Sequence, residues 1–252
     1  MSELDTAANI AARMRALTPA RVGLSRTGVS LGTRELLDFQ ACHARARDAV
    51  HARIETAALA ATLSQLTGGE VLRLHSAAAD RSTYLKRPDL GRLLDEASEE
   101  LLANRAATAE YDLALIVADG LSALAVERHA VALIAELLPR LAGWKLAPVT
   151  IVEQGRVAVS DGVGTAVGAR IAAILIGERP GLNSPDSLGV YVTYGPRAGC
   201  TDAERTCLSN IRPEGLGYAQ AAAEMAAILT EAGRLRLTGV RLQQVMRQIE
   251  KG

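Results

Sequence analysis

From Tyr111 onward the chain alternates between short apolar runs and helix-length segments, and this alternation constrains the fold more than any other feature. Residues 113–118 (Leu-Ala-Leu-Ile-Val-Ala) are continuously apolar, which is typical of a strand buried on both faces of a parallel sheet. Strands are also predicted at 148–152, 169–176 and 189–194. Helices are predicted at 122–138, 157–167 and 218–230. Strands that alternate with helices indicate β-α-β units, so this half should form a Rossmann-like, mostly parallel sheet flanked by helices.

The first hundred residues have a mainly helical pattern instead. Helical spacing of apolar residues predicts one helix over 33–66, which ends at Gly68-Gly69, and another over 90–102 with Leu93 and Leu101 inward. Residues 1–20 look like a short helical arm, and 70–75 like a short strand. We therefore expect an α/β protein with two parts. Residues 1–105 form an N-terminal helical region, residues 106–252 form a Rossmann-like domain, and the boundary falls near 104–108.

Composition argues against several classes of protein. The 28 basic and 28 acidic residues cancel, so no global field attracts nucleic acid or anionic lipid. Three cysteines without C-x-x-C spacing favour a reducing cytosol. The N-terminus lacks a signal-peptide core, and no run approaches the ~18 apolar residues of a membrane helix. The sequence predicts a soluble intracellular protein that binds neither nucleic acid nor a membrane.

No metal site or hydrolytic site is predicted. His43 and His51 lie about two helical turns apart, no Cys/His cluster has zinc spacing, and G-x-S-x-G does not occur. A glycine string at 162–168 keeps open the alternative of a nucleotide-binding, Rossmann-type oxidoreductase. The dinucleotide fingerprint directly follows a strand, however, whereas this string begins about ten residues past one. We expect these glycines to let a short helix approach the sheet.

Three carboxylates mark a candidate ligand-binding edge. Asp119, Glu153 and Glu178 each directly follow a predicted strand, and the carboxyl ends of parallel strands meet at one edge of a sheet. Ordinary turn chemistry also places polar residues after strands. The pattern alone therefore leaves a binding edge and plain loops equally open.

Four strings carry a family resemblance. In chain order they are Arg-Pro-Asp-Leu-Gly-Arg (87–92), Asp-Gly-Leu-Ser (119–122), Leu-Ile-Gly-Glu-Arg-Pro-Gly-Leu (175–182) and Thr-Cys-Leu-Ser-Asn-Ile (206–211). Their order and approximate spacing resemble the small (light) subunit of ethanolamine ammonia-lyase. The resemblance runs from about Arg21 to Leu242, which is nearly the whole chain.

The resemblance implies a function. The family's enzyme joins a TIM-barrel large subunit, which holds the substrate and the catalytic residues, to a small subunit that covers the cobalamin. It uses adenosylcobalamin, a cobalt cofactor, to convert ethanolamine to acetaldehyde and ammonia by a radical mechanism. This chain should therefore bind adenosylcobalamin, pair with a large subunit, and carry neither a catalytic residue nor a metal ligand. The implied location is the cytoplasm, inside a bacterial microcompartment where the host makes one.

The family's cobalamin contacts carry over to Val157, Glu178 and Cys207. A corrin is an apolar plate ringed by neutral amides, so it favours aliphatic surface with a few fixed polar groups. Glu178 can accept hydrogen bonds from those amides, while Val157 and Cys207 offer small apolar contacts. A capping box at 201–204 predicts a short helix through Cys207. The interval from Glu178 to Cys207 is about one residue shorter than in some family members.

Overall fold

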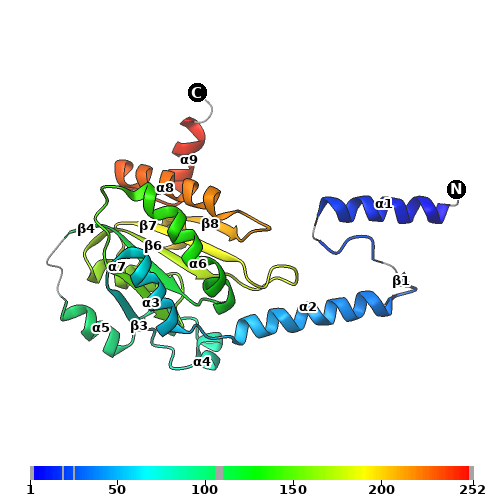
Figure 1. The fold of residues 1–252 in the computed structure, drawn as a ribbon, viewed down its shortest axis with the longest axis horizontal. Helices are drawn as coiled ribbons and strands as arrows, with labels where there is room; N and C mark the ends of the chain where they lie inside the picture. Colours follow the sequence, from blue (N-terminus) through cyan, green and yellow to red (C-terminus); the bar gives the residue numbers. More distant parts are fainter. Residues whose placement is uncertain (1–2, 19, 25, 106–109, 250–252) are drawn as a thin grey trace.

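The computed structural model describes residues 3–18, 20–24, 26–105 and 110–249. Within them, a six-stranded sheet of order β3-β5-β4-β6-β7-β8 forms the centre of the molecule (Figure 1). The first four strands in this order run parallel; β7 pairs antiparallel with β6 and with β8, so β7 alone of the six runs in the opposite direction. The strands are β3 (Val71–His75), β4 (Tyr111–Ala118), β5 (Val149–Glu153), β6 (Ala169–Gly177), β7 (Leu188–Tyr194) and β8 (Arg205–Ile211). The predicted α/β class with a mostly parallel sheet is confirmed.

Helices cover both faces of the sheet. One face carries α3 (Thr56–Thr67), α6 (Ala123–Leu137) and α8 (Tyr218–Leu235), and the other carries α5 (Glu96–Ala103) and α7 (Val159–Ala166). Successive residues of β4 therefore enter different cores, since Leu115 packs with the first group of helices and Ile116 with the second. This two-sided burial explains the continuous apolar run in the sequence.

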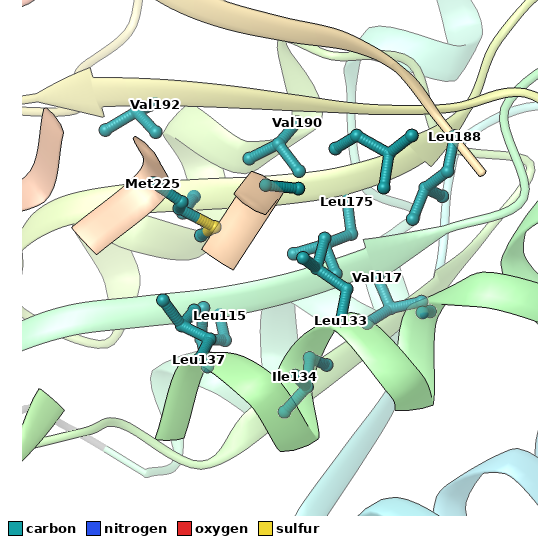
Figure 2. Packing of buried hydrophobic residues seen from close by; sticks show 14 of the residues in the cluster. Leu115, Val117, Leu133, Ile134, Leu137, Leu175, Leu188, Val190, Val192 and Met225 are labelled. Carbon is teal, nitrogen blue, oxygen red and sulfur yellow. The ribbon is translucent and has the colours of Figure 1, made fainter. Parts of the chain in front are cut away.

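The larger core is aliphatic. Figure 2 shows Leu133, Ile134 and Leu137 of α6 beside Leu115 and Val117 of β4, with Met225 of α8 close to the neighbouring strands. Burying one such side chain fully contributes about 1.5–3 kcal/mol. The sheet is thus a rigid platform whose strand ends are fixed in position.

A close approach of α7 to the sheet depends on Gly164. A Cβ atom there would lie 3.0 Å from the Ala172 Cβ of β6 and 2.8 Å from the Pro196 Cγ. Within the glycine string, Gly164 therefore serves packing between helix and sheet, whereas a Cβ on Gly162 would meet nothing within 4 Å.

The predicted single helix over 33–66 is wrong. The structure has α2 (Thr33–His51), an extended break, and then α3. The break lets Ile54 enter the core, and the Glu55 backbone N–H donates to Glu127 of α6 at 3.2 Å. Helix α3 then packs on the sheet, while α2 leaves it and runs outward to the hairpin of β1 (Arg26–Thr27) and β2 (Ser30–Leu31); α1 (Glu3–Leu17) also lies away from the sheet (Figure 1). The predicted stop at Gly68 is confirmed, with φ +67°.

Two further helix boundaries differ from prediction. Residues 90–102 are split into a 3-10 turn η1 (Leu90–Arg92) and α5, because Asp95 caps α5 by accepting from the Ser98 N–H. Leu93 and Leu101 are consequently exposed rather than inward, at 60% and 38%. Helix α8 runs past the predicted stop at Gly233 and ends where Arg236 turns left-handed, before α9 (Val240–Ile249).

Strand β3 belongs to the same sheet as the strands of the second half, since it pairs with β5. Part of the predicted boundary at 104–108 lies outside the described residues, and the division into 1–105 and 106–252 stays a prediction. Among the helices of the described ranges, none combines the length and the apolar character needed to cross a bilayer.

Candidate functional site

A pocket of about 430 Å³ opens at the carboxyl edge of the sheet. This is the edge where open α/β sheets bind ligands. The loops after β4 and β5 and the end of β6 form most of its wall, and α4 (Arg81–Lys86) and β7 complete it. The lining residues are Tyr84, Gly120, Leu121, Arg156, Val157, Ile176, Gly177, Glu178, Arg179 and Tyr191.

Glu178 is held in one orientation by three neutral donors. Its Oε1 accepts from the Ser209 hydroxyl at 2.5 Å, and its Oε2 accepts from the Ser187 hydroxyl and from the Asn210 backbone N–H, the latter at 3.2 Å. Asn210 has a φ of +60°, a conformation that asparagine tolerates better than most residues. Among the described residues no cation pairs with Glu178, so its charge stays available at the pocket.

Val157 lies in the loop that leads from β5 into α7. This loop is tied to the string at 87–92, since the Arg156 backbone N–H donates to the Gly91 carbonyl at 2.7 Å. A Cβ on Gly91 would lie 2.8 Å from the Arg156 Cγ and 3.0 Å from the Tyr84 ring. The string from the first half of the chain therefore packs directly behind the pocket wall.

Tyr84 is the buried centre of that wall. The Arg81 and Arg156 guanidinium carbons lie 4.7 and 4.2 Å from its ring centroid, within cation–π range. Its hydroxyl donates to the Gly155 carbonyl at 3.1 Å, and burial raises its pKa. Sequence reasoning missed Tyr84 and Arg156. The available signal was their position beside the string at 87–92 and beside Val157.

Cys207 lies on β8 and not on a helix, so that prediction is wrong. The capping box at Thr201 and Glu204 is confirmed, but it caps only a 3-10 turn η3 (Asp202–Glu204). Pairing with β7 then extends the chain, and Cys207 lies opposite Tyr191.

Burial raises the pKa of the Cys207 thiol, against the lowering effect of the neighbouring Tyr191 hydroxyl. Tyr191 lines the pocket, whereas Cys207 is not among the lining residues. The structure thus brings Val157 and Glu178 together and places Cys207 one layer behind, as a neutral thiol.

The other two carboxylates at the strand ends do not face this pocket. Asp119 is 2% exposed, contacts the Arg81 guanidinium at 3.3 Å and accepts from the Gly155 N–H at 3.2 Å. Burial raises the pKa of the Asp119 carboxyl to about 6, against the lowering effect of Arg81. Glu153 lines a separate pocket beside β3.

The described part of the chain contains no group of three or more His, Cys, Asp or Glu that could hold a metal ion. What the site offers is recognition: aliphatic surface from Leu121, Val157 and Ile176, one oriented carboxylate acceptor, and two arginines. Fold and site together describe an α/β protein with a pocket at the carboxyl edge of its mostly parallel sheet.

Comparison with known proteins identifies the family. The family model for the ethanolamine ammonia-lyase light chain (EutC) matches residues 8–243. The ethanolamine ammonia-lyase small subunit of Ralstonia nicotianae is 58% identical over 235 residues, covering 92% of this chain and 87% of the relative. Those of Xanthomonas campestris pv. campestris and Pseudomonas syringae pv. tomato are 56% and 54% identical, covering 92% and 91% of this chain and 86% and 81% of the relatives. The chain belongs to the small (light) chain family of ethanolamine ammonia-lyase, whose members are lyase subunits.

Proposed function

We propose that this chain is the cofactor-covering subunit of an adenosylcobalamin-dependent ethanolamine ammonia-lyase, with the substrate held by a large subunit. The supporting observation is that Val157 and Glu178, two residues matched to the family's cobalamin contacts, line one pocket at the ligand-binding edge of the sheet. When bound, adenosylcobalamin supplies the radical chemistry that converts ethanolamine to acetaldehyde and ammonia. We expect the complex in the cytoplasm, inside a bacterial microcompartment where the host makes one.

The pocket residues fit the rim of a corrin. Leu121, Val157 and Ile176 provide aliphatic surface for the ring, and Glu178 provides an acceptor for a peripheral amide N–H. Each Glu178 oxygen can accept more than one hydrogen bond, so the three donors within this chain leave capacity for a ligand. In this proposal Cys207 supports the site by fixing Tyr191, which itself lines the pocket.

This chain's residues bind and orient in the proposal, and they make no bonds with the substrate. Glu178 fixes the cofactor's rotation through a directional hydrogen bond, because its own geometry is set by Ser187 and Ser209. Val157 and Ile176 exclude water from the ring face that they cover. A second chain must then cover the open side of the pocket.

We further propose that the outward arm, α1 with α2, contacts the large subunit. The arm lies away from the sheet (Figure 1) and exposes large apolar side chains. A patch of this kind on a family of small subunits favours the large subunit as its occupant. The exposed side chains are Ile10, Met14, Leu17, Leu36, Leu37 and Phe39.

Leu37→Asp should therefore abolish co-purification with the large subunit. Val240→Asp is the matched control, because Val240 is similarly exposed (51% against 59%) but lies on α9. Equal recovery of the large subunit with Leu37→Asp and with the unsubstituted chain would refute this interface.

The function itself is tested by co-expressing the chain with its large subunit and measuring acetaldehyde release from ethanolamine with and without adenosylcobalamin. Corrinoid binding is followed in parallel by visible absorbance. Turnover should require both chains and the cofactor. The proposal fails if the pair shows no cobalamin-dependent turnover, or if the large subunit binds the corrinoid equally well without this chain.

A further inference from the structure

Arg179 is a charged residue at the pocket whose charge is not used by the fold. It directly follows Glu178, is exposed, and lines the pocket. Within the part of the chain that the structure describes, it makes no ion pair and no side-chain hydrogen bond. An exposed arginine that makes no polar contact of its own within the described chain is available for a ligand.

Arg156, on the opposite wall, is held rigidly but lacks a counterion. Its Nη2 donates to the Tyr84 carbonyl at 3.2 Å, and its guanidinium stacks on the Tyr84 ring. Its Nε is buried without a hydrogen-bond partner, and no carboxylate of the described chain pairs with it. A partly desolvated cation of this kind is stabilised when an anion binds beside it.

The remaining charges at the pocket do not neutralise these two arginines. Glu178 is the one carboxylate among the lining residues, and neutral groups bind it. The pocket lining therefore has an excess of positive charge.

Backbone groups add to this charge where α7 begins. In the described structure the N–H groups of Val157 and Ala158 donate no hydrogen bond within the chain. They lie at the start of α7, which carries the partial positive charge of a helix N-terminus.

We infer that Arg179 and Arg156 form an anion subsite beside Glu178 that binds a phosphodiester. The planar fork of arginine matches the oxygens of a phosphate group. Cobalamin carries one phosphodiester, which joins the corrin to its nucleotide base. The inference rests on the proposed function and deepens it, since it names the part of the cofactor that this chain recognises. Free inorganic phosphate is the other source of the same chemistry.

Three corrinoid probes separate the contributions of ring and phosphate. Cyanocobalamin has both, cobinamide phosphate has the ring and a phosphate but no nucleotide base, and cyanocobinamide has the ring alone. Their affinities for the complex with the large subunit are measured by visible absorbance. The variants are Arg179→Gln, which changes an exposed side chain, and Arg156→Lys, which keeps a charge over Tyr84. Arg73→Gln is the control, because Arg73 is exposed on β3 outside the pocket.

Arg179→Gln should weaken cyanocobalamin and cobinamide phosphate about tenfold and leave cyanocobinamide unchanged, because only the charge-assisted contact is lost. Arg156→Lys should show the same pattern more weakly, and Arg73→Gln should change none of the three. Inorganic phosphate should compete with cyanocobalamin in the unsubstituted complex and not in Arg179→Gln.

Equal weakening of all three probes, or no weakening, would overturn the subsite while leaving the proposed function standing. Phosphate binding that does not displace cyanocobalamin would also overturn it, since it would mark a site for free phosphate. No binding of any probe to the unsubstituted complex would refute the proposed function and the subsite together.

Discussion

Charges are used in opposite ways in two regions on the α7 side of the sheet. Between α7 and β8, Arg205 donates to both carboxylate oxygens of Asp161 at 2.8 and 2.7 Å, and both side chains are almost fully buried. At the pocket, Glu178 accepts from neutral groups, and neither Arg156 nor Arg179 pairs with a carboxylate of the described chain. The first region neutralises its charges internally, whereas the second leaves them unpaired within the described chain. The contrast separates a structural ion pair from the pocket proposed as a binding site.

The buried pair Arg81–Asp119 lies between these extremes. Its single guanidinium–carboxylate contact is 3.3 Å long, and Arg81 also donates to the carbonyls of Val50 and Gly120. Burial lowers the pKa of Arg81 and raises that of Asp119. For Arg205, burial acts in the same direction, but the hydrogen bonds and charge of Asp161 raise its pKa above the usual value. Burial alone therefore does not make a strong ion pair, whereas the bidentate geometry of Arg205 and Asp161 does.

The largest expected effect is on stability, at the buried pair of Arg205 and Asp161. Asp161→Asn leaves the Arg205 charge buried and uncompensated, so the free energy of unfolding should fall by about 3–5 kcal/mol. Urea unfolding of the purified chain measures this. Asp89→Asn is the matched control, because it breaks an exposed pair with Arg87 and should leave the free energy of unfolding nearly unchanged. A loss below about 1 kcal/mol for Asp161→Asn would remove the distinction between the two regions.

The next effect is on the pocket, and it should appear in binding rather than in stability. Glu178→Gln removes the charge and one acceptor oxygen, so corrinoid affinity in the complex should fall about tenfold, or ~1.4 kcal/mol. The free energy of unfolding should change by about 1 kcal/mol or less, because the three donors of Glu178 are neutral. Glu153→Gln, at the separate pocket beside β3, is the control. An unchanged Kd, or a stability loss equal to that of Asp161→Asn, would contradict this prediction.

The Arg81–Asp119 pair should make the free energy of unfolding depend on pH. The folded protein binds the Asp119 proton more tightly than the unfolded chain does, because the carboxyl pKa rises from about 3.9 to about 6 on folding. Asp119 therefore contributes most to stability below about pH 4, and that contribution is lost as the pH rises through about 6. Asp119→Asn removes this titration. The unfolding free energy of the unsubstituted chain minus that of the variant should decrease from pH 4 to about 6 and then level off. A flat difference across this range would contradict the prediction.

Local sequence patterns predicted the strands and the helix end that can be recognised from residues close together in the sequence. The strands around 113–118 and 169–176 were found because both faces are covered and their apolar runs are continuous. The Gly68 stop was found because it acts through neighbouring backbone groups. Cys207 was misplaced because its strand depends on pairing with β7, from which it is separated in the sequence.

The candidate site was predictable to the same limited extent. The position after a strand, a local property, placed Asp119, Glu153 and Glu178 at the sheet edge, but only the family resemblance singled out Glu178, which lines the pocket. Tyr84 and Arg156 were missed because their contacts arise only when the segments at 84–91 and 154–158 meet in the fold. Strand ends locate a binding edge from sequence alone, whereas the wall facing each strand end depends on tertiary packing.

The smallest expected effect tests whether orientation of Glu178 matters at all. Ser209→Ala removes a 2.5 Å hydrogen bond to the Glu178 Oε1 from an exposed residue on β8, while Ser187 and Asn210 still bind the Oε2. Corrinoid affinity in the complex should fall about threefold, because the carboxylate is held less firmly and pays more ordering entropy on binding. Ser82→Ala, at an exposed serine of α4, is the control. An effect as large as that of Glu178→Gln would mean that Ser209 itself contacts the ligand, and no effect would mean that two donors already fix the carboxylate.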